Sequence, residues 1–272
     1  MHRIILHAFD DEGFEARSEA ALAIARQTGA HLTVMHVRPT MTAAGDVYAA
    51  GLLSSSIPES IEAEMRADEQ RFRTKAEGLF ASEDVPWDWQ VQSGLPEREL
   101  SRESVLSDLL VVSPVEGMTG AQSGETFLGR TLNAVACPML SVPTADVRFS
   151  REGRILLLWN GSAEAGRALR GAMPFLQAAE AVRILTIGTA PRGRPTASDA
   201  ARYLTPAVRN VEVREAVEDG KIGDQIREES NAFSADLVVM GAYGHARLAE
   251  LVLGGVTQAM LVQHNIPVLF AR

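Results

Sequence analysis

The feature that most constrains this fold is an internal repeat, because one order of strands and helices occurs twice along the chain. The first copy opens with an apolar strand pattern at residues 3–10 that ends in Asp10. The second copy opens with a matching pattern at residues 154–160 that ends in Asn160. Each opening strand leads into a helical pattern, and strands that alternate with helices predict parallel βαβ units with right-handed crossovers.

The remaining elements of the two copies match in the same order. The predicted pairs are helices 18–25 and 165–176, second strands 31–37 and 182–187, third strands 87–92 and 211–216, fourth strands 108–112 and 236–240, and closing strands 138–142 and 267–270. Five strands per copy predict an α/β fold of two tandem, doubly wound, five-stranded parallel-sheet domains. We place these domains at residues 1–146 and 147–272, on either side of a break in the polar linker 144–153.

Composition bounds the class of protein. With 272 residues, 46% of them hydrophobic and 22% charged, the chain is long enough for two soluble domains that each bury a core. No apolar run approaches the roughly 20 residues that span a bilayer, and the first residues lack a signal-peptide pattern, so no membrane partner is expected. The single cysteine, Cys137, cannot form an internal disulfide, which favours a cytoplasmic protein. Cys137 is interpreted as a small, buried hydrophobic residue.

The net charge of −9 argues against nucleic acid as a partner, since no stripe of Lys and Arg is available to neutralise phosphates. The charge is also unevenly divided. Residues 1–146 hold 11 Lys and Arg against 22 Asp and Glu, a balance of −11, whereas residues 147–272 hold 15 against 13, a balance of +2. A polyanionic ligand is therefore expected to prefer the second half.

A glycine-rich loop follows the fourth strand of the second copy. Gly241 and Gly244 come directly after the apolar run, and Gly254 and Gly255 follow after nine intervening residues. Glycines at these spacings let backbone N–H groups approach a phosphate closely, and the second pair opens a helix whose N-terminus favours an anion. Because ligands of doubly wound sheets bind beyond the carboxyl ends of the strands, this loop should converge with the end of the first strand at Asn160.

Two other kinds of nucleotide site are excluded by spacing. A Walker A loop needs a lysine after its second glycine, but the chain has only Lys75 and Lys221, and Ile222 follows the latter where Ser or Thr is required. A dinucleotide fingerprint would place G-x-G-x-x-G after a first strand, and neither copy has it. A nicotinamide or flavin enzyme is therefore not expected.

The glycine loop, the duplicated five-strand order and the Cys-Pro and Ile-Pro starts of the closing strands together resemble the universal stress protein (UspA-like) family in its tandem two-domain form. This resemblance implies an adenine nucleotide alpha hydrolase-like fold, with the halves packed as an intramolecular pseudo-dimer through closing strands 139–142 and 268–270. A further homodimer stays open. The ligand that the resemblance implies is ATP or another adenine nucleotide, with or without magnesium.

The residues of this chain that match the nucleotide site of the family lie in the second copy. They are the first-strand end Asn160 and Gly161, the adenine-side positions Ile187 and Met240, and the loop and helix start Gly241, Gly244, His245, Gly254, Gly255, Val256 and Thr257. Among these, His245 is a candidate for reaching a phosphate from the loop.

The second copy departs from the family pattern at two of these positions. Asn160 stands in place of the first-strand acid, so it can still hydrogen-bond a ribose hydroxyl but carries no charge. Gly255 stands in place of the Ser or Thr whose hydroxyl meets a phosphate. Such a donor is worth about 0.5–1.5 kcal/mol, and Thr257 in the same helical turn is a candidate substitute.

The first copy departs much further. Aligned on its neighbouring strands, it has Ser113 at the place of Gly241, Glu116 at that of Gly244, and Glu125 and Thr126 where Gly254 and Gly255 stand. Two of these side chains are carboxylates, which repel a phosphate at close range. The first half is therefore expected to have lost the site, although Gly117, Gly120 and Gly124 leave a shifted glycine cradle as an alternative.

Other candidate groups indicate no catalytic or metal site. The histidines lack metal-ligand spacing, and no activated nucleophile or matched acid–base pair is present. The acidic cluster 10–12 is interpreted as helix-capping residues, with divalent-metal binding as the alternative. Segments 40–60 and 190–201 are either lids over the strand ends or disordered loops, and Arg192 and Arg194 would meet phosphates if their loop folds over the site.

The sequence therefore predicts a stress-response or regulatory protein whose second domain binds ATP or a related adenine nucleotide and acts as a nucleotide-dependent switch on an unidentified protein partner. Two alternatives stay open: a slow ATPase or phosphotransfer enzyme, and a scaffold in which both sites are vestigial.

Overall fold

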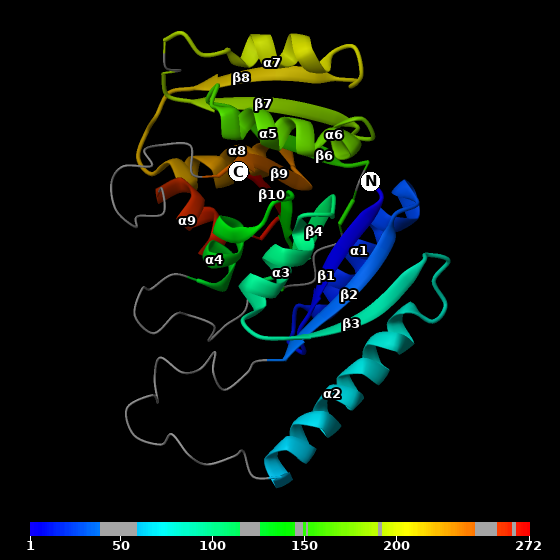
Figure 1. The fold of residues 1–272 in the computed structure, drawn as a ribbon. Helices are drawn as coiled ribbons and strands as arrows, with labels where there is room; N and C mark the ends of the chain where they lie inside the picture. The colour runs from blue at the N-terminus through cyan, green and yellow to red at the C-terminus, as the bar shows by residue number, and fades with distance from the viewer. Residues whose placement is uncertain are drawn as a thin grey trace, which may run out of the picture.

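One continuous sheet runs through the molecule, in the strand order β3-β2-β1-β4-β5-β10-β9-β6-β7-β8 (Figure 1). This computed structural model describes residues 1–38, 59–114, 126–144, 149–150, 152–189, 192–242, 255–262 and 265–272. Its strands are β1 Arg3–Ala8, β2 His31–Arg38, β3 Trp87–Ser93, β4 Leu109–Val112, β5 Met139–Ser141, β6 Arg154–Leu158, β7 Ala181–Ile187, β8 Val211–Ala216, β9 Leu237–Gly241 and β10 Val268–Ala271. The predicted strands and their order are thus confirmed.

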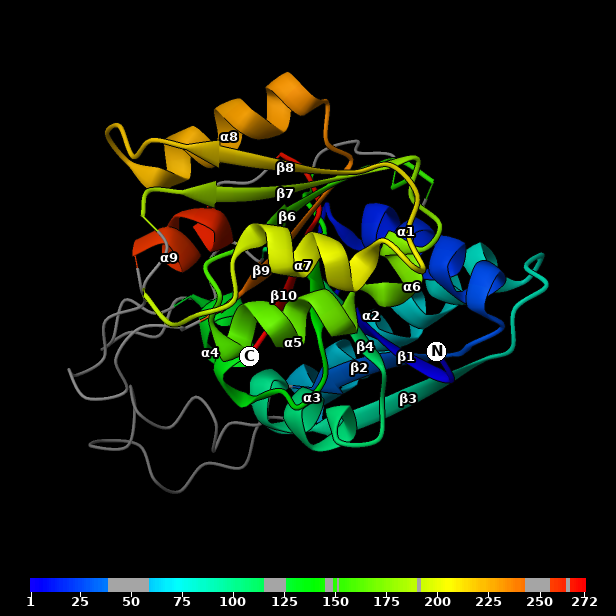
Figure 2. The ribbon, with the colours of Figure 1, turned by 90° about the horizontal axis from the view of Figure 1, so that it is seen from above.

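Helices cover both faces of the sheet, as the doubly wound prediction requires. They are α1 Phe14–Thr28, α2 Glu59–Phe80, α3 Pro96–Ser104, α4 Phe127–Ala134, α5 Ala163–Gly171, α6 Met173–Leu176, α7 Ala197–Leu204, α8 Ile222–Phe233 and α9 Gly255–Val262. One apolar core layer joins the sheet to α1, α2, α5, α6 and α7, and a second joins it to α3, α4, α8 and α9. Figure 2 shows strands β6 to β8 between α8 on one side and α5 and α7 on the other. Each core layer therefore extends across both halves.

The two halves meet at β5 and β10, which pair antiparallel while every other neighbouring pair is parallel. Leu140 faces Leu269 at the centre of this seam, with Met139 opposite Phe270 and Ser141 opposite Val268. All of these side chains are buried. The prediction that the closing strands pair across the halves is confirmed. Because the seam is antiparallel, the carboxyl ends of the strands point in opposite directions in the two halves.

The register of the central strands fixes which residues of the two halves are equivalent. Ile4 pairs with Leu109 in the first half, and Ile155 pairs with Leu237 in the second. A carboxylate ties each opening strand in the same way: Asp108 Oδ2 accepts from the Arg3 N–H at 3.1 Å, and Asp236 Oδ2 from the Arg154 N–H at 2.7 Å.

Counting along the opening strands from this tie makes Phe9, not Asp10, the equivalent of Asn160. The pairing of the two strand-end residues expected from the sequence is therefore wrong by one position. The first half has one more residue between its opening strand and its helix. The same register places Ser113 at the position of Gly241, as predicted.

Two local predictions are corrected. The predicted helix 165–176 is two helices, because Pro174 in the first turn of α6 has no N–H to continue the ladder from α5. Gly241 is the last residue of β9 rather than the first residue of a loop. In the part of the chain that the structure describes, none of the helices has the length and apolar character needed to span a bilayer.

Candidate functional site

The second half has the arrangement in which doubly wound sheets bind ligands. Strand β6 lies between β9 and β7, and Leu157 pairs with Val239 on one side and Ile184 on the other. The chain leaves β6 first toward β7 and only later returns to β9, and doubly wound sheets bind ligands where such connections diverge. The predicted residues Asn160, Ile187 and Gly241 thus come to one edge of the sheet, at the carboxyl ends of its three central strands.

Asn160 is partly committed to the local fold. Its side-chain oxygen accepts a hydrogen bond from the Ser162 N–H at 3.1 Å, and the Ser162 hydroxyl oxygen accepts from the Ala165 N–H at 3.1 Å. These two bonds form a turn and cap the first turn of α5. The amide N–H groups of Asn160 are not used in this turn, so the side chain remains able to donate at the strand edge.

Gly161 is required by both its conformation and its neighbours. Its φ is +69°, and a Cβ there would lie 2.6 Å from the Pro195 carbonyl oxygen and 2.8 Å from Arg194 Cβ. The Trp159 indole Nε1 donates to the same Pro195 carbonyl at 3.0 Å. The loop 192–196 therefore packs on the end of β6, and α7 follows it.

For Gly241 the structure gives a packing reason that the sequence did not. A Cβ there would lie 2.5 Å from both the Ala165 nitrogen and the Glu164 carbonyl carbon. No Cβ fits at that distance from backbone, so β9 reaches the first turn of α5 only because residue 241 is glycine. Its neighbour Met240 has its side chain buried in the core layer of α8 and α9, which leaves its backbone as the only part at the edge.

Helix α9 begins at Gly255, as predicted. Val256 is half-buried and Thr257 is buried in its first turn. Gly244, His245 and Gly254 lie outside the described residues. The same holds for Glu116, Glu125 and the glycines 117, 120 and 124 of the first half, and for most of segment 40–60.

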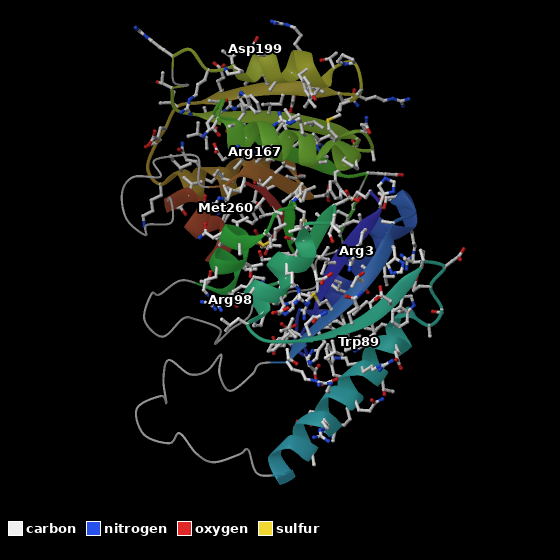
Figure 3. All side chains as sticks on the ribbon, viewed as in Figure 1. Arg3, Trp89, Arg98, Arg167, Asp199 and Met260 are labelled. Atoms are coloured by element: carbon white, nitrogen blue, oxygen red, sulfur yellow. The ribbon has the colours of Figure 1, made fainter. Side chains whose placement is uncertain are left out.

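Charged groups at this edge differ in how they are paired. Although burial opposes it, hydrogen bonds from its own backbone N–H, Arg167 and Ser162 hold the pKa of Glu164 below its usual range. The Arg167 guanidinium lies 3.2 Å from that carboxylate. Figure 3 labels Arg167 on α5 and Asp199 on α7. Arg194 differs from both, because its Nη1 is buried and makes no hydrogen bond among the residues that the structure describes.

The corresponding edge of the first half is filled by its own side chains. Arg17 of α1 is fully buried; its Nε donates to the His7 carbonyl at 2.8 Å, and its terminal nitrogens bond the Phe9 carbonyl and the Asp11 carboxylate. Asp11 Oδ1 also accepts from the Gly13 N–H at 3.0 Å. Asp11 is thus engaged in the turn that leads into α1, and the capping interpretation of cluster 10–12 stays a prediction. The sequence reasoning missed Arg17, although it is the one charged residue on the buried face of α1.

The helix start of the first half is also closed. Thr126 is the N-cap of α4, and its hydroxyl oxygen accepts from the Gly129 N–H at 3.2 Å. This bond occupies an amide that an anion would need. The equivalent residue of the second half is Gly255, which has no side chain to do the same.

Comparison with known proteins agrees with this fold. Residues 153–272 match the model of the universal stress protein family. Residues 153–272 form a universal stress protein domain. The universal stress protein Slr1230 of Synechocystis sp. is 30% identical over 147 residues, which are 53% of this chain and 50% of that protein. The chain therefore spans about half the length of this curated relative.

Solved structures extend the likeness of the universal stress protein domain to the fold of the whole chain. A universal stress protein from Archaeoglobus fulgidus covers 99% of this chain and 96% of its own length, at 16% identity and a TM-score of 0.74. A functionally unknown protein from Pseudomonas aeruginosa covers 100% and 92%, at 15% identity and a TM-score of 0.58. Both halves thus share the doubly wound α/β fold of these structures.

Proposed function

We propose that the universal stress protein domain, taken as residues 147–272, binds one ATP or related adenine nucleotide per chain, at the carboxyl ends of β6, β7 and β9. The observation that carries this proposal is the switch point at β6, with Asn160, Ile187 and Gly241 on one edge. The surplus of positive charge in the second half favours a polyanion there. The first domain, residues 1–146, carries no nucleotide in this proposal, because Arg17 and Thr126 already use its strand-end and helix-start groups.

Backbone groups make most of the contacts in this proposal. The Asn160 amide donates to a ribose hydroxyl, and the backbone at Ile187 and Met240 faces the base. The free N–H groups at the start of α9, from Gly255 to Thr257, bind phosphate oxygens, since a helix N-terminus favours negative charge. Gly244, His245 and Gly254 complete the loop as the family resemblance implies, and magnesium would supply further charge to the phosphate chain.

The packing of α9 supports a role as a switch. Met260 of α9, labelled in Figure 3, shares a buried core layer with Phe127 of α4 across the seam. A nucleotide that orders the start of α9 would therefore affect the packing of α9 against α4 in the first half. We propose that this coupling presents a nucleotide-dependent surface to a protein partner in the cytoplasm.

Titration calorimetry and thermal melts with ATP, ADP, AMP and adenosine, each with and without magnesium, test the proposal. One equivalent of adenine nucleotide per chain is expected. At a ligand concentration 100 times the Kd, the free energy of unfolding should rise by about 2.7 kcal/mol. GTP and inorganic tripolyphosphate serve as controls for base and charge. Absence of heat and of thermal shift with every adenine compound would overturn the proposal, and two equivalents per chain would overturn the assignment to the second half alone.

A further inference from the structure

Besides the glycine loop, a loop that carries cationic side chains borders the carboxyl ends of the strands in the second half. The glycine loop does not explain the presence of these cations. Loop 192–196 follows β7 and precedes α7. The Trp159 indole Nε1 donates to the Pro195 carbonyl at 3.0 Å, and the loop approaches the end of β6 so closely that a Cβ on Gly161 would lie 2.8 Å from Arg194 Cβ. The Arg194 side chain therefore leaves the backbone directly beside the Asn160–Gly161 turn.

In the second half two arginines, Arg154 and Arg194, each have a buried donor without a hydrogen-bond partner among the described residues, and the one beside the Asn160–Gly161 turn is Arg194. Its Nη1 is shielded from solvent, yet it makes no hydrogen bond, and Arg194 forms no ion pair among the described residues. Arg17 of the first half shows the ordinary arrangement, since its guanidinium bonds two carbonyls and a carboxylate. A guanidinium offers five N–H donors, and leaving one of them buried and unused is costly. The described residues thus supply no acceptor for Arg194 Nη1.

The carboxylates nearest to Arg194 along the chain and across the turn are already occupied. Asp199 accepts from the Thr196 N–H at 2.9 Å in the capping box of α7. Glu164 pairs with Arg167 at 3.2 Å. Neither takes part in an ion pair with Arg194, so the positive charge of the loop is not neutralised from within the described part of the domain.

We infer that Arg194 donates to a phosphate oxygen of the nucleotide bound at the β6 edge, and that it supplies the side-chain donor missing at Gly255. This inference rests on the proposed function and adds the class of ligand that the site selects: an adenine nucleotide with a phosphate chain, in preference to adenosine. An anionic oxygen satisfies the guanidinium through charge-assisted hydrogen bonds, which are stronger than those between neutral groups.

The test compares Arg194→Gln with Arg209→Gln in the full-length chain. Arg209 is an exposed arginine just before β8, at the amino ends of the strands, so its variant removes an equal charge away from the proposed site. Calorimetric titration with adenosine, AMP and ATP should show that Arg194→Gln weakens ATP about tenfold or more. Adenosine should change by less than about twofold, and Arg209→Gln should match the wild type with every ligand. Arg194→Lys, which keeps the charge, should regain part of the lost ATP affinity.

Each other outcome overturns the inference in a distinguishable way. If the wild type binds ATP and Arg194→Gln binds it equally well, Arg194 makes no phosphate contact and only the inference falls. If Arg194→Gln binds adenosine and ATP with equally reduced affinity, Arg194 shapes the binding site and makes no phosphate contact. If the wild type binds no adenine nucleotide, the proposed function and the inference fall together. Melting temperatures of the ligand-free variants, expected to stay near that of the wild type, separate a binding loss from a folding defect.

Discussion

The two halves of the chain bring the fourth strand against the first helix by placing a glycine on opposite partners. In the second half the glycine is Gly241 on the strand, and the helix contributes Glu164 and Ala165. In the first half Ser113 directly follows the strand, and the helix side carries Gly13, on which a Cβ would lie 3.1 Å from Ser113 Cβ and 2.9 Å from Thr144 Cγ2. The close contact between the fourth strand and the first helix needs a glycine on one side only, and either the strand or the helix side can supply it.

This exchange changes how the glycine pattern is interpreted. Gly241 is explained by packing alone, so it is weak evidence for a phosphate site, and replacing it tests stability before it tests binding. The polar groups at the strand ends differ in charge. In the first half Arg17 and Thr126 bond groups of their own half, and the buried atoms left without a partner among the described residues include Asp11 Oδ2 and Ser113 Oγ, neither of them cationic. At the carboxyl ends of the strands in the second half, the atom without an acceptor among the described residues is the cationic Arg194 Nη1, which favours an anion.

The largest expected effect comes from breaking the glycine exchange. Gly241→Ala places a Cβ 2.5 Å from backbone atoms that cannot rotate away, so we expect a loss of about 3 kcal/mol in the free energy of unfolding. Gly13→Ala meets side-chain atoms of Thr144 and Ser113, which can yield, so a loss of about 1 kcal/mol is expected. Urea unfolding of both variants gives the comparison. Equal losses, or a tolerated Gly241→Ala, would show that the two contacts are not counterparts.

A second test uses pH. His7 is buried against Phe127, with ring centroids 5.0 Å apart, and its Nδ1 has no hydrogen-bond partner. Burial, then the charges of Arg17 and His36, lower the pKa of His7 well below its usual value. The unfolded chain therefore binds a proton below about pH 6.5 that the folded chain does not, and stability falls as the pH falls from 7 to 5.

The second half has Leu158 at the equivalent position of its opening strand, so His7→Leu makes the halves alike. We expect this variant to remove a slope of up to about 1.4 kcal/mol per pH unit from the stability curve between pH 6.5 and 5. Urea midpoints at a series of pH values measure it. An unchanged slope in His7→Leu would mean that the buried ring is not the acid-sensitive group.

Periodicity and internal repetition were sufficient to predict the architecture. Strands of a parallel sheet with helices on both faces are buried on both sides, so their sequences are continuous apolar runs. The seam was predictable because the two short apolar closing strands would otherwise be exposed at sheet edges. What the sequence did not show depends on contacts between distant residues. The exchange of Gly13 for Gly241, the Trp159 bond to Pro195 and the burial of Arg17 each join segments whose approach no local pattern specifies. The break before Pro174 was a local signal and was overlooked.

The smallest expected effect concerns the helix starts. Thr126 caps α4 with its own hydroxyl, whereas Gly255 opens α9 without one. Gly255→Ser adds a hydroxyl where the family pattern places Ser or Thr. If a phosphate lies there, the hydroxyl donates to it, and ATP affinity measured by calorimetry should rise about two- to tenfold, the equivalent of about 0.5–1.5 kcal/mol.

The matched control for Gly255→Ser is Gly255→Ala, which adds the Cβ and its stiffening of the backbone but no donor. An equal gain from Ala and Ser would assign the effect to backbone order, and no gain from Ser would place the phosphate elsewhere. A gain confined to Ser, and to nucleotides rather than adenosine, would show that the second half has an open helix start where the first half closes its own. The loss of the site in one half would then follow from side chains that satisfy its backbone internally, and its persistence in the other from their absence.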